Sequence, residues 1–265
     1  MRGSTTITAL LVTLGISAPA MAGTPLQAPE LEPTNPAIYQ GTPAATCAWP
    51  TTVAVTTGGG LCSGTLIHPR VVSYAAHCGA SGQTRVNFGE SSWGPALQIN
   101  PDFCMTNPEY QPVQNPDGPG LIEADQGDDY AFCVLPNPVE IPVAPPLMGC
   151  EKEKLVWGEQ VAIIGFGNNQ APDSGSGTKR WAVVSLEGIN EEKNIAEVSF
   201  NGEPAICSGD SGGPAMIQLE DGGWRTFGIT STGPVDGCGA PGAKTFSLLT
   251  GAIPWIEANS GIDVT

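Results

Sequence analysis

The sequence predicts an all-β fold of many short strands with little helix. Glycine and proline account for 35 and 25 of the 265 residues, and only 14% of the residues are charged. Short apolar segments alternate with turns rich in Gly, Pro, Asn and Asp, a pattern typical of barrels and sandwiches with little helix. The clearest strand candidates are Thr52–Thr56, Arg85–Phe88, Gln160–Ile164, Trp181–Leu186, Ala196–Phe200 and Phe227–Ser231.

The first 22 residues have the features of a secretory signal peptide. Arg2 precedes an apolar core from Ile7 to Ile16, and Ala20-Met21-Ala22 offers a small-residue cleavage site before Gly23. This core is too short to span a bilayer, and no later apolar run approaches the length of a membrane helix. An uncleaved anchor is the alternative. We therefore expect a secreted, extracellular protein that has no membrane association once the signal is removed.

Residues 23–37 are rich in proline and offer little to bury, so we interpret them as the propeptide of a zymogen. The folded domain is then expected over residues 38–265. The chain has 26 acidic and 10 basic residues, which gives a formal charge of −16 at pH 7. Such a surface repels nucleic-acid phosphates and anionic membranes, so we expect neither as a partner.

The hexapeptide from Gly209 to Pro214, Gly-Asp-Ser-Gly-Gly-Pro, is the strongest candidate for a catalytic motif. Ser211 can act as a nucleophile only if a neighbouring base takes its proton. Backbone N–H groups must also stabilise the oxygen that becomes negative during the attack. The flanking glycines allow the tight turn that this requires. The alternative is a flexible turn with an idle serine, which is common where Gly and Ser occur alone.

A base and an acid for Ser211 can be sought among few residues, because the chain has two histidines. His77 follows an apolar stretch and is flanked by small residues and a cysteine. His68 precedes a proline in an expected turn and should face solvent. Asp129 leads into the apolar run 130–135, which is typical of a buried strand. The acidic loop 115–128 is expected to be solvated, with an overhang of the cleft as the alternative, and it contains Asp117, Asp125 and Asp128.

In this order, Ala75-Ala76-His77-Cys78, Asp129-Tyr130-Ala131 and the hexapeptide resemble the motifs of the chymotrypsin/trypsin-like serine endopeptidases. The order His, Asp, Ser separates this family from the subtilisin-like enzymes and the α/β-hydrolases. The resemblance covers about residues 38–258. Further segments resemble the family, with Phe166 and Thr232 each replacing a tryptophan: Gly165-Phe166-Gly167, Ser231-Thr232-Gly233 and Pro254-Trp255-Ile256.

The resemblance implies two six-stranded antiparallel β-barrels, at about residues 38–145 and 146–250, and a short helix at about 250–259. His77 would take the proton from Ser211 as the serine attacks a peptide carbonyl, and Asp129 would orient the imidazole. The N–H groups of Gly209 and Ser211 would form the oxyanion hole. We expect activity to be lost at acidic pH, where His77 is protonated.

The eight cysteines of an exported chain are expected to form disulfides rather than metal sites. The resemblance implies two pairs, Cys62–Cys78 beside His77 and Cys207–Cys238 beside the Ser211 turn. A Cys104–Cys133 bridge between neighbouring strands and a Cys47–Cys150 bridge between the N-terminal segment and the interdomain connection are our hypotheses for the remaining four.

The resemblance also implies that activation starts at Ile38. In this family, cleavage frees an α-ammonium that inserts beside the aspartate preceding the catalytic serine, which is Asp210 here. Tyr39 and Gln40 depart from the family's Val and Gly at the mature start. Ala37 stands where trypsin-like activators require a basic residue, so we expect cleavage after a small residue by another kind of activating protease.

The expected specificity pocket argues against cleavage after Lys or Arg. Trypsin-like members place an aspartate six residues before the serine, and Ala205 stands there. Its methyl group cannot pair with a guanidinium, and Ile206 would shorten the pocket. We predict an apolar or aromatic preference, whereas an inward-pointing Lys244 would give an acidic one. The substrate-binding candidates are Ala205, Ile206, Ser231, Thr232, Gly233 and Gly242.

No cofactor or metal is expected. Gly89-Glu90 resembles the start of the family's calcium loop, but residues 91–95 offer no second carboxylate, and calcium requires six or more oxygens. We expect a monomer that acts on protein or peptide substrates. Two other functions stay open from the residues alone: an inactive relative that serves as a binding module, and an esterase that uses the same triad.

Overall fold

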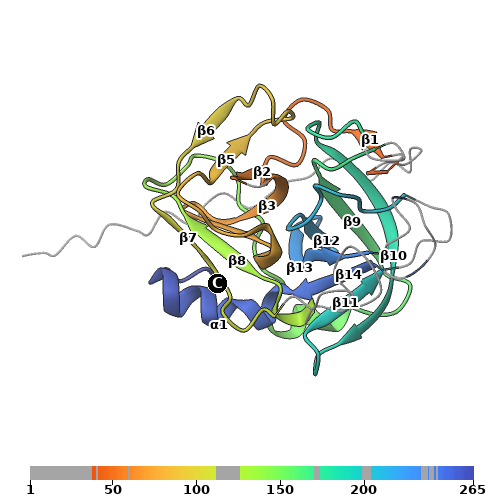
Figure 1. The fold of residues 1–265 in the computed structure, drawn as a ribbon. Helices are drawn as coiled ribbons and strands as arrows, with labels where there is room; N and C mark the ends of the chain where they lie inside the picture. Colours follow the sequence, from red (N-terminus) through yellow and green to blue (C-terminus); the bar gives the residue numbers. More distant parts are fainter. Residues whose placement is uncertain are drawn as a thin grey trace, which may run out of the picture.

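The computed structural model of the chain describes residues 38–39, 41–58, 60–111, 126–169, 174–198, 204–233, 238, 242 and 244–265. Its strands form two sheets, and one α-helix follows them near the C-terminus (Figure 1). The expected signal and propeptide, residues 1–37, lie outside the described residues, as do residues 112–125 of the expected acidic loop.

The N-terminal sheet has seven strands in the order β6-β5-β2-β3-β4-β8-β7, all of them antiparallel to their neighbours. These strands are β2 (Thr52–Thr57), β3 (Gly60–His68), β4 (Val71–Tyr74), β5 (Arg85–Phe88), β6 (Leu97–Ile99), β7 (Phe103–Thr106) and β8 (Ala131–Val134).

The expected all-β architecture of two barrels is confirmed, although the first barrel is not fully closed. Among the described residues no pairing joins the end strands β6 and β7, so the sheet is a curled half-barrel. Both end strands are partly exposed, including Leu97, Phe103 and Met105. They therefore lack the two-sided burial that barrel closure would give them.

Six of the seven strands of the C-terminal sheet, all but β1, close into a barrel. Its order is β1-β10-β11-β14-β13-β12-β9, and a further pairing of β9 with β10 returns the sheet on itself. Its strands are β1 (Thr42–Pro43), β9 (Gln160–Gly165), β10 (Arg180–Asn190), β11 (Ile195–Val198), β12 (Pro214–Gln218), β13 (Trp224–Thr232) and β14 (Lys244–Leu248).

The strand candidates from the sequence are confirmed with small changes of bounds. Arg85–Phe88 is β5 unchanged, and β2 and β9 are each one residue longer than expected. The expected strand at 181–186 lies within the longer β10, whose alternating burial places every second side chain in the barrel core. Of the expected strand Ala196–Phe200, the last two residues lie outside the described part.

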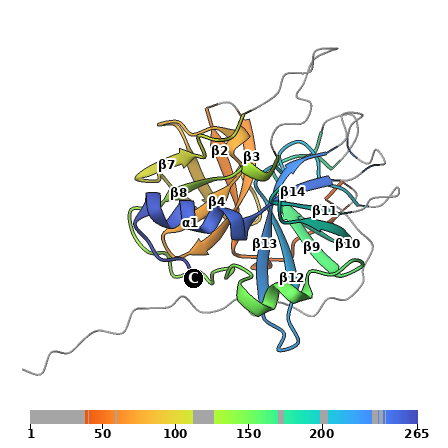
Figure 2. The same cartoon turned by 90° about the horizontal axis from the view of Figure 1, so that it is seen from below.

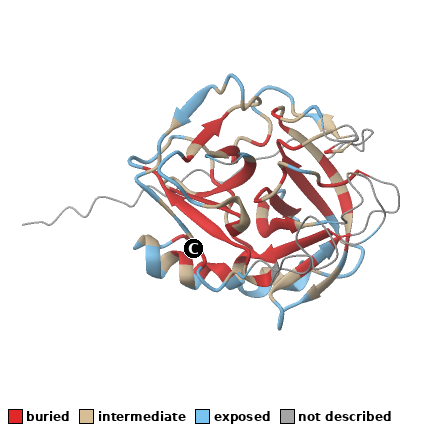
Figure 3. Ribbon diagram, in the orientation of Figure 1, coloured by how far each residue is buried: buried red, intermediate tan, exposed pale blue. Residues whose placement is uncertain are grey.

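Each sheet encloses its own apolar core, and the buried residues lie inside the two sheets and under the helix (Figure 3). A third cluster joins α1 (Leu249–Ser260) to the N-terminal sheet through Ile67 and Phe132. Seen from below, α1 crosses the N-terminal sheet (Figure 2), and it contacts β8, β13 and β14. Within the described residues, no helix has the length and apolar character to cross a membrane.

The helix also fixes the start of β8, where the expected acid of the site lies. The Trp255 ring packs edge-on against Tyr130 and Phe132, with centroid distances of 5.5 and 5.2 Å. Such aromatic pairs stabilise a fold beyond the area that they bury. Because Tyr130 follows Asp129 directly, this packing holds the Asp129 backbone against the helix.

Candidate active site

His77 lies at the end of β4, in the short 3₁₀-helix η1 (Ala76–Cys78). The Cys62–Cys78 disulfide ties η1 to β3. The His77 backbone N–H donates to Asp129 Oδ1 at 2.9 Å, and His77 Nδ1 lies 2.7 Å from Asp129 Oδ2. Backbone and ring of the histidine thus both contact one carboxylate, which fixes the plane of the imidazole and directs Nε2 away from Asp129.

Asp129 is fully buried, whereas the His77 side chain is 24% exposed. Besides the histidine, the Ser231 hydroxyl donates to Asp129 Oδ2 at 2.6 Å. The Ser247 hydroxyl donates to the Asp129 carbonyl at 3.1 Å. A buried carboxylate needs such donors, because burial without partners costs several kcal/mol or more. The sequence interpretation assigned Ser231 to substrate binding alone and missed Ser247.

Ser211 lies in the turn before β12, at the edge of the C-terminal barrel. Two glycines of this turn have left-handed backbones, Gly209 with φ +98° and Gly212 with φ +84°, which side chains disfavour. The carbonyl of Ser211 accepts the Ser63 N–H at 2.8 Å, so the turn is attached to β3 of the other sheet.

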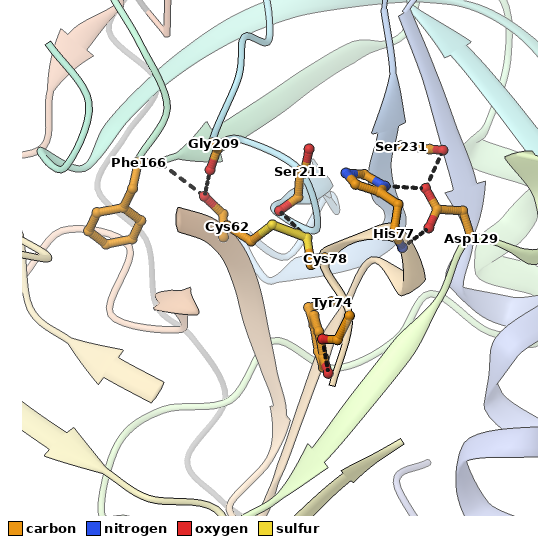
Figure 4. The surroundings of a disulfide bond; sticks show 11 residues. Cys62, Tyr74, His77, Cys78, Asp129, Phe166, Gly209, Ser211 and Ser231 are labelled. Carbon is orange, nitrogen blue, oxygen red and sulfur yellow. Dashed lines mark hydrogen bonds and ion pairs between the residues drawn. A yellow bond between two sulfur atoms is a disulfide. The ribbon is translucent and has the colours of Figure 1, made fainter. Parts of the chain in front are cut away.

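In Figure 4 the imidazole of His77 lies between Ser211 and the Asp129 carboxylate. The structure therefore brings together the three residues that the motifs indicated, from η1, the segment leading into β8 and the turn before β12. Among the described residues no hydrogen bond joins the Ser211 hydroxyl to His77. Such bonds are often long in a substrate-free site and tighten when substrate binds.

The N–H groups of Gly209 and Ser211 have no protein acceptor in the described part of the chain, whereas those of Asp210, Gly212 and Gly213 all donate to backbone carbonyls. Two N–H donors without a protein partner, one on each side of Asp210 and beside a serine hydroxyl, can donate hydrogen bonds to a substrate oxygen. The arrangement is thus suited to stabilising a tetrahedral oxyanion.

Asp210 is only 1% exposed and lies behind the serine turn. Its Oδ1 accepts the Gly167 N–H at 2.7 Å, and its Oδ2 accepts the Cys207 N–H at 2.8 Å. Burial raises the pKa of Asp210 to about 7, against the lowering effect of these two bonds and of the Arg180 charge. Among the described residues no Lys or Arg forms an ion pair with it.

The glycines of the Gly165-Phe166-Gly167 segment are explained by this aspartate. A Cβ at residue 167 would lie 2.6 Å from the Asp210 carboxyl carbon, and one at residue 165 would also contact the carboxyl group. The carboxylate therefore fills the space in which side chains would otherwise lie.

Ile38 is 2% exposed and belongs to the same core cluster as Ala205 and Ile206. The N–H of the next residue, Tyr39, donates to the Ala205 carbonyl at 2.9 Å. The expected new N-terminus thus lies against the segment that carries Ala205 and Ile206.

The expected pocket residues differ in their accessibility. Ala205 and Ile206 are buried in the barrel core, whereas Gly233 and Gly242 are exposed. Lys244 is 1% exposed, and burial lowers its pKa to about 8. A Cβ placed on Gly233 would lie 2.8 Å from Lys244 Cδ and 3.5 Å from its Nζ. The methylenes of the lysine therefore pack against one side of this exposed glycine.

Three of the four expected disulfides are present: Cys62–Cys78, Cys104–Cys133 and Cys207–Cys238. The expected Cys47–Cys150 bridge is wrong, because both thiols are free and exposed. Separate contacts hold the two residues. The Cys47 N–H donates to the Glu90 carboxylate at 2.8 Å. Cys150 lies in η3 (Gly149–Lys154), where Glu151 pairs with Arg225 at 2.9 Å.

The residues of the site do not suit a metal. In the described part of the chain one group of possible ligands lies close together, Cys62, His77 and Cys78, but the two sulfurs are joined in a disulfide. A disulfide offers no thiolate to a metal ion. The second histidine, His68, is half-buried in the β3–β4 turn and accepts the Arg70 N–H at 3.1 Å, so it takes no part in the site.

The chain is similar to several known proteins. The sequence profile of the family described as Trypsin matches residues 38–256. The chain is 28% identical to Serine protease 1 of Drosophila melanogaster over 221 residues, 76% of each protein. It is 28% identical to Brachyurin of Leptuca pugilator over 212 residues, 76% of this chain and 88% of the relative. A solved structure of HL collagenase matches with a TM-score of 0.68 at 19% identity, covering 85% of this chain and 99% of that one.

Proposed function

Because the chain belongs to the trypsin family of serine proteases, we propose that it is a secreted endopeptidase that cleaves peptide bonds through Ser211, His77 and Asp129. The observation that carries the proposal is the double contact of His77 with the buried Asp129 carboxylate, at 2.9 and 2.7 Å, on the side of the imidazole opposite Ser211. The three disulfides are consistent with secretion.

In the proposed mechanism His77 Nε2 takes the proton of the Ser211 hydroxyl as its oxygen attacks the substrate carbonyl carbon. The same imidazole then gives the proton to the departing amine, which leaves an acyl group on Ser211. Water attacks this ester with His77 again acting as the base. Asp129 accepts the His77 and Ser231 donors through Oδ2. It fixes the tautomer of His77 and stabilises the imidazolium.

The negative oxygen of the tetrahedral intermediate would be bound by the N–H groups of Gly209 and Ser211. Both lack a protein acceptor within the described residues, so no existing bond has to break when a substrate oxygen arrives. Donors that are fixed in advance lower the barrier because they need no reorganisation. Losing one such donor costs roughly 3 kcal/mol of transition-state stabilisation.

Activation would supply the cation that Asp210 lacks. Cleavage before Ile38 creates an α-ammonium, and Ile38 is already buried in the cluster that includes Ala205 and Ile206. A buried carboxylate whose pKa lies near 7 gains most from a nearby positive charge. N-terminal sequencing of secreted, active protein tests this step. A mature chain starting anywhere other than Ile38 would remove the role of Asp210.

The proposed specificity is for an apolar or aromatic residue before the scissile bond. Ala205 offers no carboxylate to a basic side chain, and Lys244 presents its methylenes to Gly233 while its charge is inaccessible to solvent. A peptide-library profile of the wild type and of Lys244→Met tests this. Equal profiles with an apolar preference support the proposal. A preference for Asp or Glu that Lys244→Met abolishes would show that the ammonium selects the substrate.

Labelling with a fluorophosphonate separates an enzyme from an inactive binding module. We expect stoichiometric labelling of Ser211 and no labelling of Ser211→Ala, because only an activated hydroxyl attacks this reagent. An unlabelled wild type would leave a binding module as the function. Peptide amides and esters of the same acyl group then decide between an endopeptidase and an esterase, and an enzyme that cleaves only the esters would contradict our proposal.

A further inference from the structure

Ser63, a fully buried residue of β3, connects the two sheets at the site. Its hydroxyl accepts the Phe166 N–H at 3.0 Å and donates to the Gly209 carbonyl at 2.9 Å, the two bonds that are drawn from Phe166 and Gly209 in Figure 4. Its own N–H donates to the Ser211 carbonyl at 2.8 Å. No local sequence pattern singles out this serine.

The direction of each bond is fixed by the chemistry of the partners. A backbone N–H can only donate and a carbonyl can only accept, so the single hydroxyl hydrogen of Ser63 must point at Gly209. The hydroxyl is therefore held from two sides. The bond to the Gly209 carbonyl restrains the peptide that follows Gly209. This restraint matters because a glycine with a left-handed φ of +98° has a permissive backbone.

The same serine is packed tightly against the rest of the turn. A Cβ on Gly213 would lie 3.2 Å from the Ser63 Cβ, and a Cβ on Gly212 would collide with the Ser63 carbonyl oxygen. Ser63 thus contacts Gly209, Ser211, Gly212 and Gly213, four of the six residues of the hexapeptide, from a strand of the other sheet.

We propose that the Ser63 hydroxyl is a positioning group for the oxyanion hole, because it anchors Gly209 so that its N–H faces the reacting carbonyl. This inference rests on the proposed endopeptidase function. The hydroxyl does not touch the substrate. It acts through Gly209. The bond from the Ser63 backbone N–H to the Ser211 carbonyl is kept whatever side chain residue 63 carries, so it holds the nucleophile in every variant.

The test compares Ser63→Ala with Ser73→Ala. Ser73 is a buried serine of the neighbouring strand β4, and within the described part of the chain its hydroxyl bonds only to the Thr65 carbonyl, at 3.5 Å. Removing a whole oxyanion donor lowers kcat by about 10²–10³, so loosening one should lower it roughly 10–100-fold. We expect this loss in Ser63→Ala with KM within about threefold, and no loss in Ser73→Ala.

A second readout isolates the oxyanion hole from general stability. The best peptide of the library profile is made as an aldehyde, to which the Ser211 oxygen adds to give a tetrahedral adduct, and as the matched alcohol, which forms no adduct. In Ser63→Ala we expect the aldehyde to bind more weakly by the same factor as kcat falls, while the alcohol is unaffected. A purely structural defect would weaken both.

The outcomes are distinct. If Ser63→Ala keeps its kcat and aldehyde affinity within twofold of the wild type, the positioning role is wrong while the endopeptidase function stands. If the wild type itself is unreactive to fluorophosphonate, the proposed function fails first. Should Ser63→Ala not accumulate as folded protein, Ser63→Cys replaces it, because a thiol is a weaker donor of similar shape. Wild-type kcat in that variant would equally overturn the inference.

Discussion

Asp210 should make the uncleaved chain more stable at pH 5 than at pH 8. Burial raises its pKa from 3.8 to about 7, so the folded chain binds this proton more tightly than the unfolded chain does. The contribution of Asp210 to the free energy of unfolding is then fully present below its pKa in the unfolded chain. It is lost as the pH rises through its pKa in the folded chain. The perturbation is Asp210→Asn, made in a Ser211→Ala background so that self-cleavage does not interfere.

The magnitude follows from the two pKa values. One pKa unit corresponds to about 1.4 kcal/mol, so a shift from 3.8 to about 7 is worth about 4 kcal/mol in full. Between pH 5 and pH 8, about two of these pKa units contribute to the change in the free energy of unfolding. Asp210 should therefore contribute about 3 kcal/mol more to the free energy of unfolding at pH 5 than at pH 8.

Urea denaturation at both pH values measures this difference. The many other acidic groups also titrate, so the informative quantity is the pH effect in Ser211→Ala minus that in Asp210→Asn/Ser211→Ala. An asparagine leaves the Gly167 or the Cys207 N–H without its acceptor, but this cost is equal at both pH values and cancels.

Parallel pH profiles of the two proteins would refute the reasoning, because Asp210 would then not titrate in this range. The chain that begins at Ile38 is the matched comparison. If its α-ammonium reaches Asp210, the carboxylate is stabilised at pH 8 and the difference between the two proteins should shrink or change sign.

Three further changes probe other contacts of the described residues. Ser231→Ala removes the 2.6 Å donor to Asp129 Oδ2 and should lower kcat roughly 10–100-fold, because a hydrogen bond to a charged group is worth about 1.5–3 kcal/mol. A loss below twofold would contradict the role of that bond. Cys104→Ser/Cys133→Ser opens a bridge of sequence separation 29 and should lower the free energy of unfolding by about 3–4 kcal/mol, whereas Cys47→Ser/Cys150→Ser should leave it nearly unchanged; finding no free thiols in the denatured wild type would reveal the missing fourth bridge. Burial lowers the pKa of Lys179 to about 8, so the folded chain binds this proton less tightly, and urea denaturation should show the wild type gaining about 2 kcal/mol relative to Lys179→Met between pH 8 and pH 10. Equal profiles would show that the ammonium is better solvated than its 1% exposure indicates.

The sequence was most informative where chemistry is local. The motifs around His77, Asp129 and Ser211 could be read directly, because each combines a reactive side chain with glycines, small residues or a following strand. The structure places the three side chains together. The strands could be predicted for the same reason, since alternating burial and turn residues are written over a few neighbouring positions.

Contacts between distant segments could not be predicted. Ser63 lies 146 residues before Gly209, and Ser247 lies 118 residues after Asp129. A serine in a buried strand has no local signal that names its partner. The Cys47–Cys150 pairing failed for a similar reason, because elimination among the remaining cysteines carries no information on whether two of them lie within bonding distance.

The two buried aspartates of the site differ in a way that bears on activation. Asp129 accepts His77 and Ser231 donors in a chain that still carries residues 1–37. Among the described residues, Asp210 accepts only the two backbone N–H groups of Gly167 and Cys207, which do not offset the cost of burying its charge. In the proposed mechanism the base and its orienting acid would therefore be in place before cleavage at Ile38. The proposed new N-terminus would then have to neutralise Asp210, which lies between Gly209 and Ser211, the two residues whose N–H groups would hold the oxyanion. Activation should thus change the oxyanion hole more than the His77–Asp129 pair.

We expect the uncleaved chain to bind the peptide aldehyde far more weakly than the chain that begins at Ile38, while the matched alcohol binds both alike. Equal aldehyde affinities would show that the hole is complete without Asp210 being neutralised.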